Sequence, residues 1–182
     1  RRVRAWFVVA VVLALLTPTS YAGSEASYVN AAQKAAERGN TLAQTYLGGL
    51  YLRGKGVPKD YAKAMRWYIK SAEQGDVTAQ LILGSGYHGG PGFPKDMAKA
   101  MHWYRKAAEQ GNAAAQKTLG WRYYFGNAIP KEYSKAIYWF KLAAEQGNAK
   151  AQLLLGMTYE DGQLAGHYIR WSQSAPNKGR PT

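Results

Sequence analysis

The feature that most constrains the fold is a short segment that occurs three times. Residues 66–76 read RWYIKSAEQGD, residues 102–112 read HWYRKAAEQGN, and residues 138–148 read YWFKLAAEQGN, so the copies lie 36 residues apart. Self-similarity at a fixed period of roughly 20–50 residues indicates an array of supersecondary units. The chain is therefore expected to fold as a series of similar small units, each of which stacks on the next.

Whole columns of residues follow this period. Leucine recurs, always followed by glycine, and so do tyrosine, proline and tryptophan: Leu47, Leu83, Leu119 and Leu155; Tyr51, Tyr87, Tyr123 and Tyr159; Pro58, Pro94 and Pro130; Trp67, Trp103 and Trp139. These columns predict repeats at residues 40–75, 76–111 and 112–147, with a partial fourth repeat at 148–171.

The first half of each repeat has the pattern of a helix. It begins at an N-cap residue that follows a glycine, namely Asn40, Asp76, Asn112 or Asn148, and it is expected to stop at Gly54, Gly90, Gly126 or Gly162. In the first copy, Ala43, Leu47 and Tyr51 form one apolar stripe on this helix.

The second half has the pattern of another helix, after a loop with glycine and proline. Its expected cap is Asp60, Asp96 or Glu132. In the first copy, this helix carries Ala64, Tyr68 and Ala72 on one side. Such a pair of helices cannot bury its apolar faces alone, so neighbouring repeats must stack.

A glycine column runs through the middle of the first helices, at Gly48, Gly84, Gly120 and Gly156. Each such glycine costs up to about 1 kcal/mol relative to alanine inside a helix. Its recurrence in every copy predicts a close approach of two helices that a side chain would block.

These residues carry a resemblance to a known family. Ala-Gln-x-x-Leu-Gly-x-x-Tyr, followed by Gly, Pro and Asp and then by Lys-Ala-x-x-Trp-Tyr-x-Lys-Ala-Ala-Glu-Gln-Gly, resembles the Sel-one-like repeat (SLR) family. The resemblance covers residues 40–162 and implies an all-α fold, a right-handed α-solenoid related to tetratricopeptide repeats. It also implies a non-enzymatic adaptor that holds a protein or peptide, as several exported bacterial members do.

The ends of the chain depart from the repeat. Residues 1–22 combine a basic start, an apolar run of twelve residues from Ala5 to Leu16, and small residues before Gly23. This layout predicts a signal peptide and an exported, periplasmic or secreted protein, because the alternative, a membrane anchor, needs an apolar run that spans about 30 Å. Residues 23–39 are expected to form an N-terminal capping helix. Near the other end, the segment IRWSQSA resembles a second helix that follows a shortened loop. Residues 172–182 are expected to be a disordered tail.

The sequence contains no recognisable catalytic, cofactor-binding or metal-binding set. The chain has no cysteine, and the separations of its three histidines, His88, His102 and His167, fit no metal-binding motif. Most carboxylates recur in every copy, which indicates a structural role. We therefore expect no enzyme activity and no cofactor.

The basic charge leaves two interpretations open. Loss of Arg1, Arg2 and Arg4 with a signal peptide would lower the net charge from +13 to +10, and export argues against a nucleic-acid partner. Nine lysines lie on repeat columns: Lys59, Lys95 and Lys131; Lys63, Lys99 and Lys135; Lys34, Lys70 and Lys106. They form either a solvated face that maintains solubility or a stripe for anionic envelope polysaccharide or lipid.

Specificity is expected where the copies differ. First-helix positions opposite the apolar stripe, which line the concave surface in tetratricopeptide-like arrays, supply the candidate residues for protein binding: Lys117, Trp121, Arg122, Tyr124, Phe125, Leu81, His88 and Met157. Aromatic residues flanked by cations have the composition of an interface hot spot. The alternative is that Trp121 or Phe125 packs on the adjoining repeat.

Overall fold

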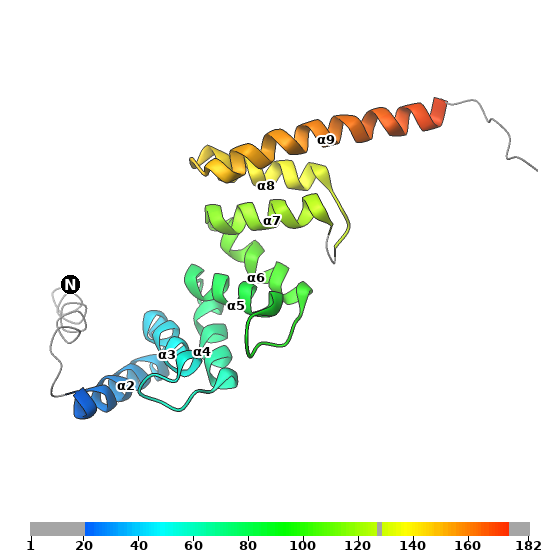
Figure 1. The fold of residues 1–182 in the computed structure, drawn as a ribbon. Coiled ribbons are helices and arrows are strands. Elements are labelled where there is room, and N and C mark those ends of the chain that lie inside the picture. Colours follow the sequence, from blue (N-terminus) through cyan, green and yellow to red (C-terminus); the bar gives the residue numbers. More distant parts are fainter. Residues whose placement is uncertain (1–20, 127–128, 175–182) are drawn as a thin grey trace, which may run out of the picture. The chain divides into compact units, whose positions relative to one another are not determined.

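The computed structural model describes the backbone of residues 21–126 and 129–174, and the side chains of residues 27–126 and 129–162. Within this part the chain forms eight helices (Figure 1): α2 (Tyr21–Glu37), α3 (Thr41–Arg53), α4 (Tyr61–Glu73), α5 (Val77–Gly89), α6 (Met97–Glu109), α7 (Ala113–Phe125), α8 (Tyr133–Glu145) and α9 (Ala149–Ser174). The all-α prediction is confirmed, with paired helices that repeat about every 36 residues as an α-solenoid requires.

The chain divides into two compact units, Arg1–Trp67 and Tyr68–Thr182. In the first unit, Leu47 and Leu50 of α3 pack with Val29 and Ala36 of α2, and the partly buried Trp67 packs against this cluster. In the second unit, the predicted stripes supply several fully buried apolar side chains: Leu83, Leu119, Ala100, Ala136 and Phe140. Burial of these apolar columns holds neighbouring helices together, because a single helix pair cannot cover its own faces.

The first-helix boundaries follow local chemistry. The side-chain oxygens of Asn40, Asp76, Asn112 and Asn148 each accept a hydrogen bond from the backbone N–H three residues later, at 2.6–3.0 Å, which confirms the predicted N-caps. Gly54 and Gly126 follow α3 and α7 with φ of 69° and 71°, the left-handed conformation that glycine adopts at low cost. Gly90 follows α5 in an extended conformation. Three of the four predicted first-helix ends are thus where the glycines indicate.

A buried glutamine column links neighbouring repeats in a way that the apolar pattern does not show. In α5, the Nε2 of Gln80 donates to the carbonyl of Ala72, and its Oε1 accepts from Gln110 at the end of α6. The same arrangement occurs one period later among Gln116, Ala108 and Gln146. Each buried amide is therefore satisfied on both sides, as a buried polar group requires.

The close helix approach that the glycine column predicts is confirmed at two positions and is wrong at a third. A Cβ built at Gly84 would lie 2.7 Å from the Tyr104 ring, and one at Gly120 would lie 2.5 Å from the Phe140 ring. At Gly156 an added Cβ meets no atom within 4 Å in the described part of the chain. The column therefore marks close packing only where the second helix of the same repeat lies against it.

The fourth repeat differs from the prediction in its second half. α9 continues as one helix through Gly162 to Ser174, so no loop directly follows Gly162, and residues 169–174 of the IRWSQSA segment lie on the same helix. The reason is visible in the sequence. The loop proline that follows each tyrosine by seven residues in the other copies is replaced by Gly166, and no proline occurs between Gly162 and Pro176.

The second helices begin near the predicted residues, but Glu132 does not cap α8. The carboxylates of Asp60 and Asp96 accept the backbone N–H of Lys63 and Lys99, at 2.8 and 3.0 Å, and these bonds lower the pKa of both aspartates. Glu132 makes no such bond.

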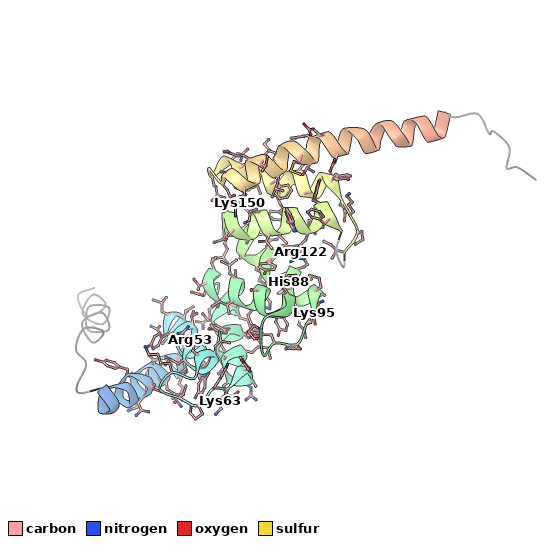
Figure 2. The ribbon with its side chains drawn as sticks, viewed as in Figure 1. Arg53, Lys63, His88, Lys95, Arg122 and Lys150 are labelled. Atoms are coloured by element: carbon pink, nitrogen blue, oxygen red, sulfur yellow. The ribbon has the colours of Figure 1, made fainter. Side chains whose placement is uncertain are left out.

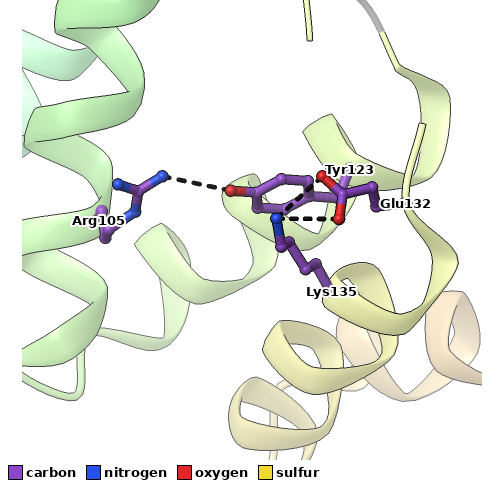
Figure 3. Close-up of polar contacts among 4 residues, drawn as sticks. All are labelled: Arg105, Tyr123, Glu132 and Lys135. Atoms are coloured by element: carbon purple, nitrogen blue, oxygen red, sulfur yellow. Dashed lines mark hydrogen bonds and ion pairs between the residues drawn. The ribbon is translucent and has the colours of Figure 1, made fainter. Parts of the chain in front are cut away.

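Figure 3 shows the contacts of the Glu132 carboxylate. It pairs with the Lys135 ammonium at 2.9 Å, and that ammonium lies 5.3 Å from the centre of the Tyr123 ring. The Tyr123 hydroxyl in turn accepts a hydrogen bond from Arg105 of α6 at 3.3 Å. Glu132 thus keeps the pair with a lysine that Asp60 and Asp96 also make, and lacks only their hydrogen bond to the backbone N–H at the helix start.

The predictions for the chain ends are tested only in part. Residues 1–20 of the predicted signal peptide lie outside the described residues, and Tyr21 and Ala22 form the first residues of α2. The predicted tail is wrong for residues 172–174, which belong to α9, and residues 175–182 lie outside the described part. None of the described helices combines the length and the hydropathy that crossing a membrane requires.

Candidate protein-binding surface

α7 presents an aromatic pair at its C-terminal end. The rings of Trp121 and Phe125 lie one helical turn apart with centroids 4.3 Å from each other. Trp121 is 41% exposed and Phe125 is 45% exposed. Each ring therefore keeps part of its surface accessible to a partner while it packs against the other ring, so the pair forms a small apolar surface.

Tyr124 packs beside this pair and is itself buried. Its side chain is only 8% exposed, so this candidate residue offers little surface to a partner. The ring lies edge-on to Phe125 with centroids 4.7 Å apart, and the hydroxyl donates to the Asp161 carboxylate of α9. This hydrogen bond, followed by burial, raises the pKa of Tyr124 to about 12.

A lysine side chain also lies near the Tyr124 ring. The Lys131 ammonium is 5.5 Å from the centre of the Tyr124 ring and 4.6 Å from the centre of the Tyr133 ring. Cation–π contacts of this kind favour one position of the ring. Sequence reasoning missed Asp161, Lys131 and Tyr133, because none of them stands beside the aromatic pair in the sequence or in its columns.

A polar contact joins α5 to α7 through two other candidate residues. Figure 2 labels His88 and Arg122, and the Arg122 Nη2 donates to the His88 Nε2 at 2.5 Å. The guanidinium is always protonated, so the neutral histidine carries its proton on Nδ1. Burial lowers the pKa of His88, and the positive charges of Arg122 and Lys95 lower it further.

The other candidates extend this face along the first helices. Lys117 is half-buried and lies one turn before Trp121 on α7. Leu81 stands one period before Lys117 and is half-buried, while Met157 stands one period after Trp121 and is 43% exposed. The structure therefore packs Trp121, Tyr124 and Phe125 together and joins His88 to Arg122, and it places Leu81 and Met157 on α5 and α9.

The lysine columns have partners within their own repeats. The ammonium groups of Lys63, Lys99 and Lys135 each lie 2.9–3.7 Å from the carboxylate of the residue three positions earlier. The same ammonium groups lie 5.3–5.5 Å from the ring centres of Tyr51, Tyr87 and Tyr123. Such exposed pairs contribute little stability each, but they hold these three lysines against the helix pair.

A metal site is not found among the residues whose side chains are described. No three histidine, aspartate or glutamate side chains gather there into a set able to hold a metal ion. His167 lies on α9 beyond the last described side chain.

The repeats identify the family of this chain. The Sel1 repeat model matches residues 41–76, 77–112, 113–148 and 149–170. The chain belongs to the Sel1 repeat family. Sel1 repeats generally form scaffolds that mediate protein interactions and are generally non-catalytic. Among the curated proteins, none matches the chain.

Two solved structures show the same Sel1 repeat fold. A protective antigen present in uropathogenic Escherichia coli strains is 43% identical, with a TM-score of 0.65, over 72% of this chain and 28% of that protein. A Sel1 repeat protein from Oxalobacter formigenes is 36% identical, with a TM-score of 0.65, over 76% of this chain and 56% of that protein. The chain therefore spans less than two thirds of the length of either relative.

Proposed function

We propose that this Sel1 repeat protein is a non-enzymatic scaffold that binds a protein or peptide through the first-helix face of α7. The observation that carries the proposal is the exposed pair of Trp121 and Phe125, whose rings pack on each other beside the buried Tyr124. An apolar, rigid and partly exposed aromatic pair supplies contact area at a low cost in side-chain entropy.

The charges around the pair indicate the chemistry of the partner. Lys117 and Arg122 lie on the same helix, and Lys95 adds a positive charge near His88. A partner segment with an apolar side chain followed by a carboxylate would match this arrangement, because the aromatic pair accepts the first and the cations attract the second.

A second function, binding of anionic polysaccharide or lipid through the lysine columns, has less support. Lys63, Lys99 and Lys135 each face a carboxylate and a tyrosine ring within their own repeat. A polyanion would have to compete with these contacts. We further propose, from the layout of residues 1–22, that the protein is exported and meets its partner in the periplasm or outside the cell.

The test is capture of envelope proteins by matched variants. A variant with both Trp121→Ala and Phe125→Ala is compared with Tyr138→Ala, which removes a 57% exposed aromatic residue from α8. We expect the double variant to lose a protein that wild type and Tyr138→Ala both retain. Equal capture by all three proteins would show that the surface of α7 is not the binding site.

A further inference from the structure

Two basic side chains touch each other between α5 and α7 without an acid to balance them. The Arg122 Nη2 donates to the His88 Nε2 at 2.5 Å, and both side chains are half-buried. Among the described residues, no carboxylate forms an ion pair with either side chain. A positive charge that is withdrawn from water normally has an acidic partner, so this contact is unusual.

The Arg122 guanidinium also carries a hydrogen-bond donor that is not satisfied. Its Nε is buried and has no hydrogen-bond partner in the part of the chain that the structure describes. A buried donor without an acceptor is unfavourable, and an ionised acceptor forms a strong bond with a guanidinium. Arg122 therefore lacks an acceptor that the described residues do not supply.

The groups around this contact add positive charge. The pKa of His88 is lowered first by burial and then by the charges of Arg122 and of Lys95, which lies in the loop between α5 and α6. Figure 2 labels these three residues. From α6, the neutral Tyr104 hydroxyl is the titratable group that the charge of Arg122 affects, and burial raises its pKa. These surroundings favour an anion.

The chemistry of the guanidinium favours a carboxylate as this anion. Neighbouring N–H groups of the planar guanidinium match the two oxygens of a carboxylate. Nε and Nη2 are such neighbours, and Nη2 is the group that contacts His88. One guanidinium also balances the single charge of a carboxylate, whereas a phosphate group carries a charge of about −1.5 to −2.

We propose that Arg122 and His88 form a carboxylate-binding subsite, which holds an acidic side chain or the terminal carboxylate of the protein or peptide partner. The inference rests on the proposed function for the nature of the partner, but the contacts that carry it are separate from the Trp121–Phe125 contact. A bound carboxylate offsets the charge of Arg122, so it favours uptake of a proton by His88 from solvent. By linkage, binding should strengthen as the pH falls toward the pKa of His88.

The experiment follows the histidine ring signals of the full chain by NMR while N-acetyl-Phe-Asp-amide is added at constant ionic strength and about pH 7. His88→Gln identifies the His88 signal by its loss. In wild type this signal should move until it saturates, and its midpoint of protonation should rise to a higher pH. The signal of the exposed His102 should stay in place.

Three variants test the role of the guanidinium. Arg122→Lys keeps the positive charge without the Nε donor, and Arg122→Gln removes both, so each should lower the affinity for the peptide at least about tenfold. Lys150→Gln removes an exposed positive charge from α9 and should bind as wild type. Melting monitored by circular dichroism shows whether each variant is folded. Wild-type affinity in a folded Arg122→Lys variant would overturn the proposal, because charge alone would then be sufficient.

Further probes need only wild type, so the proposal stays testable if a variant does not fold. N-acetyl-Phe-Gly offers a terminal carboxylate and N-acetyl-Phe-Asp-amide offers a side-chain carboxylate. A response to either one supports the subsite and identifies the source of the carboxylate. An equal response to the uncharged N-acetyl-Phe-Asn-amide overturns the proposal, and so does tighter binding of inorganic phosphate or the absence of any response.

Sodium acetate separates this inference from the proposed function, since acetate has no side chain for the aromatic pair. The His88 signal should respond to acetate in the Trp121→Ala and Phe125→Ala double variant as it does in wild type. A response in both proteins supports the subsite even if the double variant captures the same proteins as wild type. No response to acetate in wild type overturns the subsite even if the aromatic pair binds a partner.

Discussion

At the residue scale, identical residues in one column have different roles according to what packs on them. Gly84 and Gly120 accept an aromatic ring from the second helix, whereas Gly156 has open space beside it in the described part of the chain. The sequence predicts the first two correctly because the apolar columns of both helices are present. It fails at Gly156 because the column alone does not report whether a partner helix follows.

The glycine column leads to a direct stability prediction. Gly84→Leu should destabilise the fold by about 1–3 kcal/mol, because its Cβ would lie 2.7 Å from the Tyr104 ring. Gly156→Leu is the matched control and should leave the melting temperature unchanged or higher, since leucine favours a helix more than glycine does. Thermal melting monitored by circular dichroism at low protein concentration measures both. Equal losses in the two variants would contradict this interpretation of the column.

The start of α8 leads to a second prediction at this scale. Glu132→Asp shortens the side chain to the length that caps α4 and α6 in Asp60 and Asp96, so it should stabilise the protein by about 0.5–1 kcal/mol. Asp96→Glu is the reciprocal control and should destabilise by a similar amount. Denaturant unfolding of both variants measures the effect, and a loss of stability in Glu132→Asp would show that the Lys135 pair matters more than the cap.

At the element scale, caps and apolar stripes allow the helices to be predicted, but the contacts between neighbouring first helices do not follow from the repeat. Asn112 and Gly126 set the bounds of α7 by local chemistry that is legible in the sequence. The His88–Arg122 bond joins two columns whose residues vary between copies. No periodic signal predicts a contact between two such columns.

The burial of His88 beside the positive charges of Arg122 and Lys95 makes the stability of the fold depend on pH. The pKa of His88 is lowered in the folded protein from its ordinary value of 6.5, so the unfolded chain takes up a proton first as the pH falls. The stability that neutral His88 contributes is present above pH 6.5 and is lost as the pH falls through the lower, folded-state pKa. His88→Gln keeps an acceptor for Arg122 without titrating.

The measurement is the change in melting temperature between about pH 8 and about pH 5. Wild type should lose more stability over this range than His88→Gln does. His102→Gln, which replaces an exposed histidine on α6, is the control and should retain the wild-type pH dependence. An identical pH dependence in wild type and His88→Gln would show that His88 contributes no pH-dependent stability.

At the scale of the whole molecule, the sequence predicts the scaffold better than the surface. Columns that recur in every repeat define helices, caps and core, because each copy repeats the same packing. The candidate surface depends on residues that occur once. Tyr124, for example, is fixed by Asp161 on α9, which lies 37 residues away. The sequence therefore indicates which helix carries the aromatic residues, and the structure shows which of them are accessible.

Export is the prediction that concerns the ends of the molecule. The layout of residues 1–22 predicts that the mature protein begins at Gly23. N-terminal sequencing of the protein recovered from the periplasm or medium of an expressing bacterium measures this directly. An exported product that still begins at Arg1 would contradict the prediction.

The most direct test of the proposed binding surface compares binding and stability in the same variants. Once a partner is captured, calorimetric titration is carried out with wild type, the Trp121→Ala and Phe125→Ala double variant, and Tyr138→Ala. We predict that the double variant loses at least about 2 kcal/mol of binding free energy. Its melting temperature should stay close to that of wild type, because both rings are more than a third exposed. Unchanged affinity in the double variant, or a sharp fall in its melting temperature, would contradict the assignment of α7 as the binding surface.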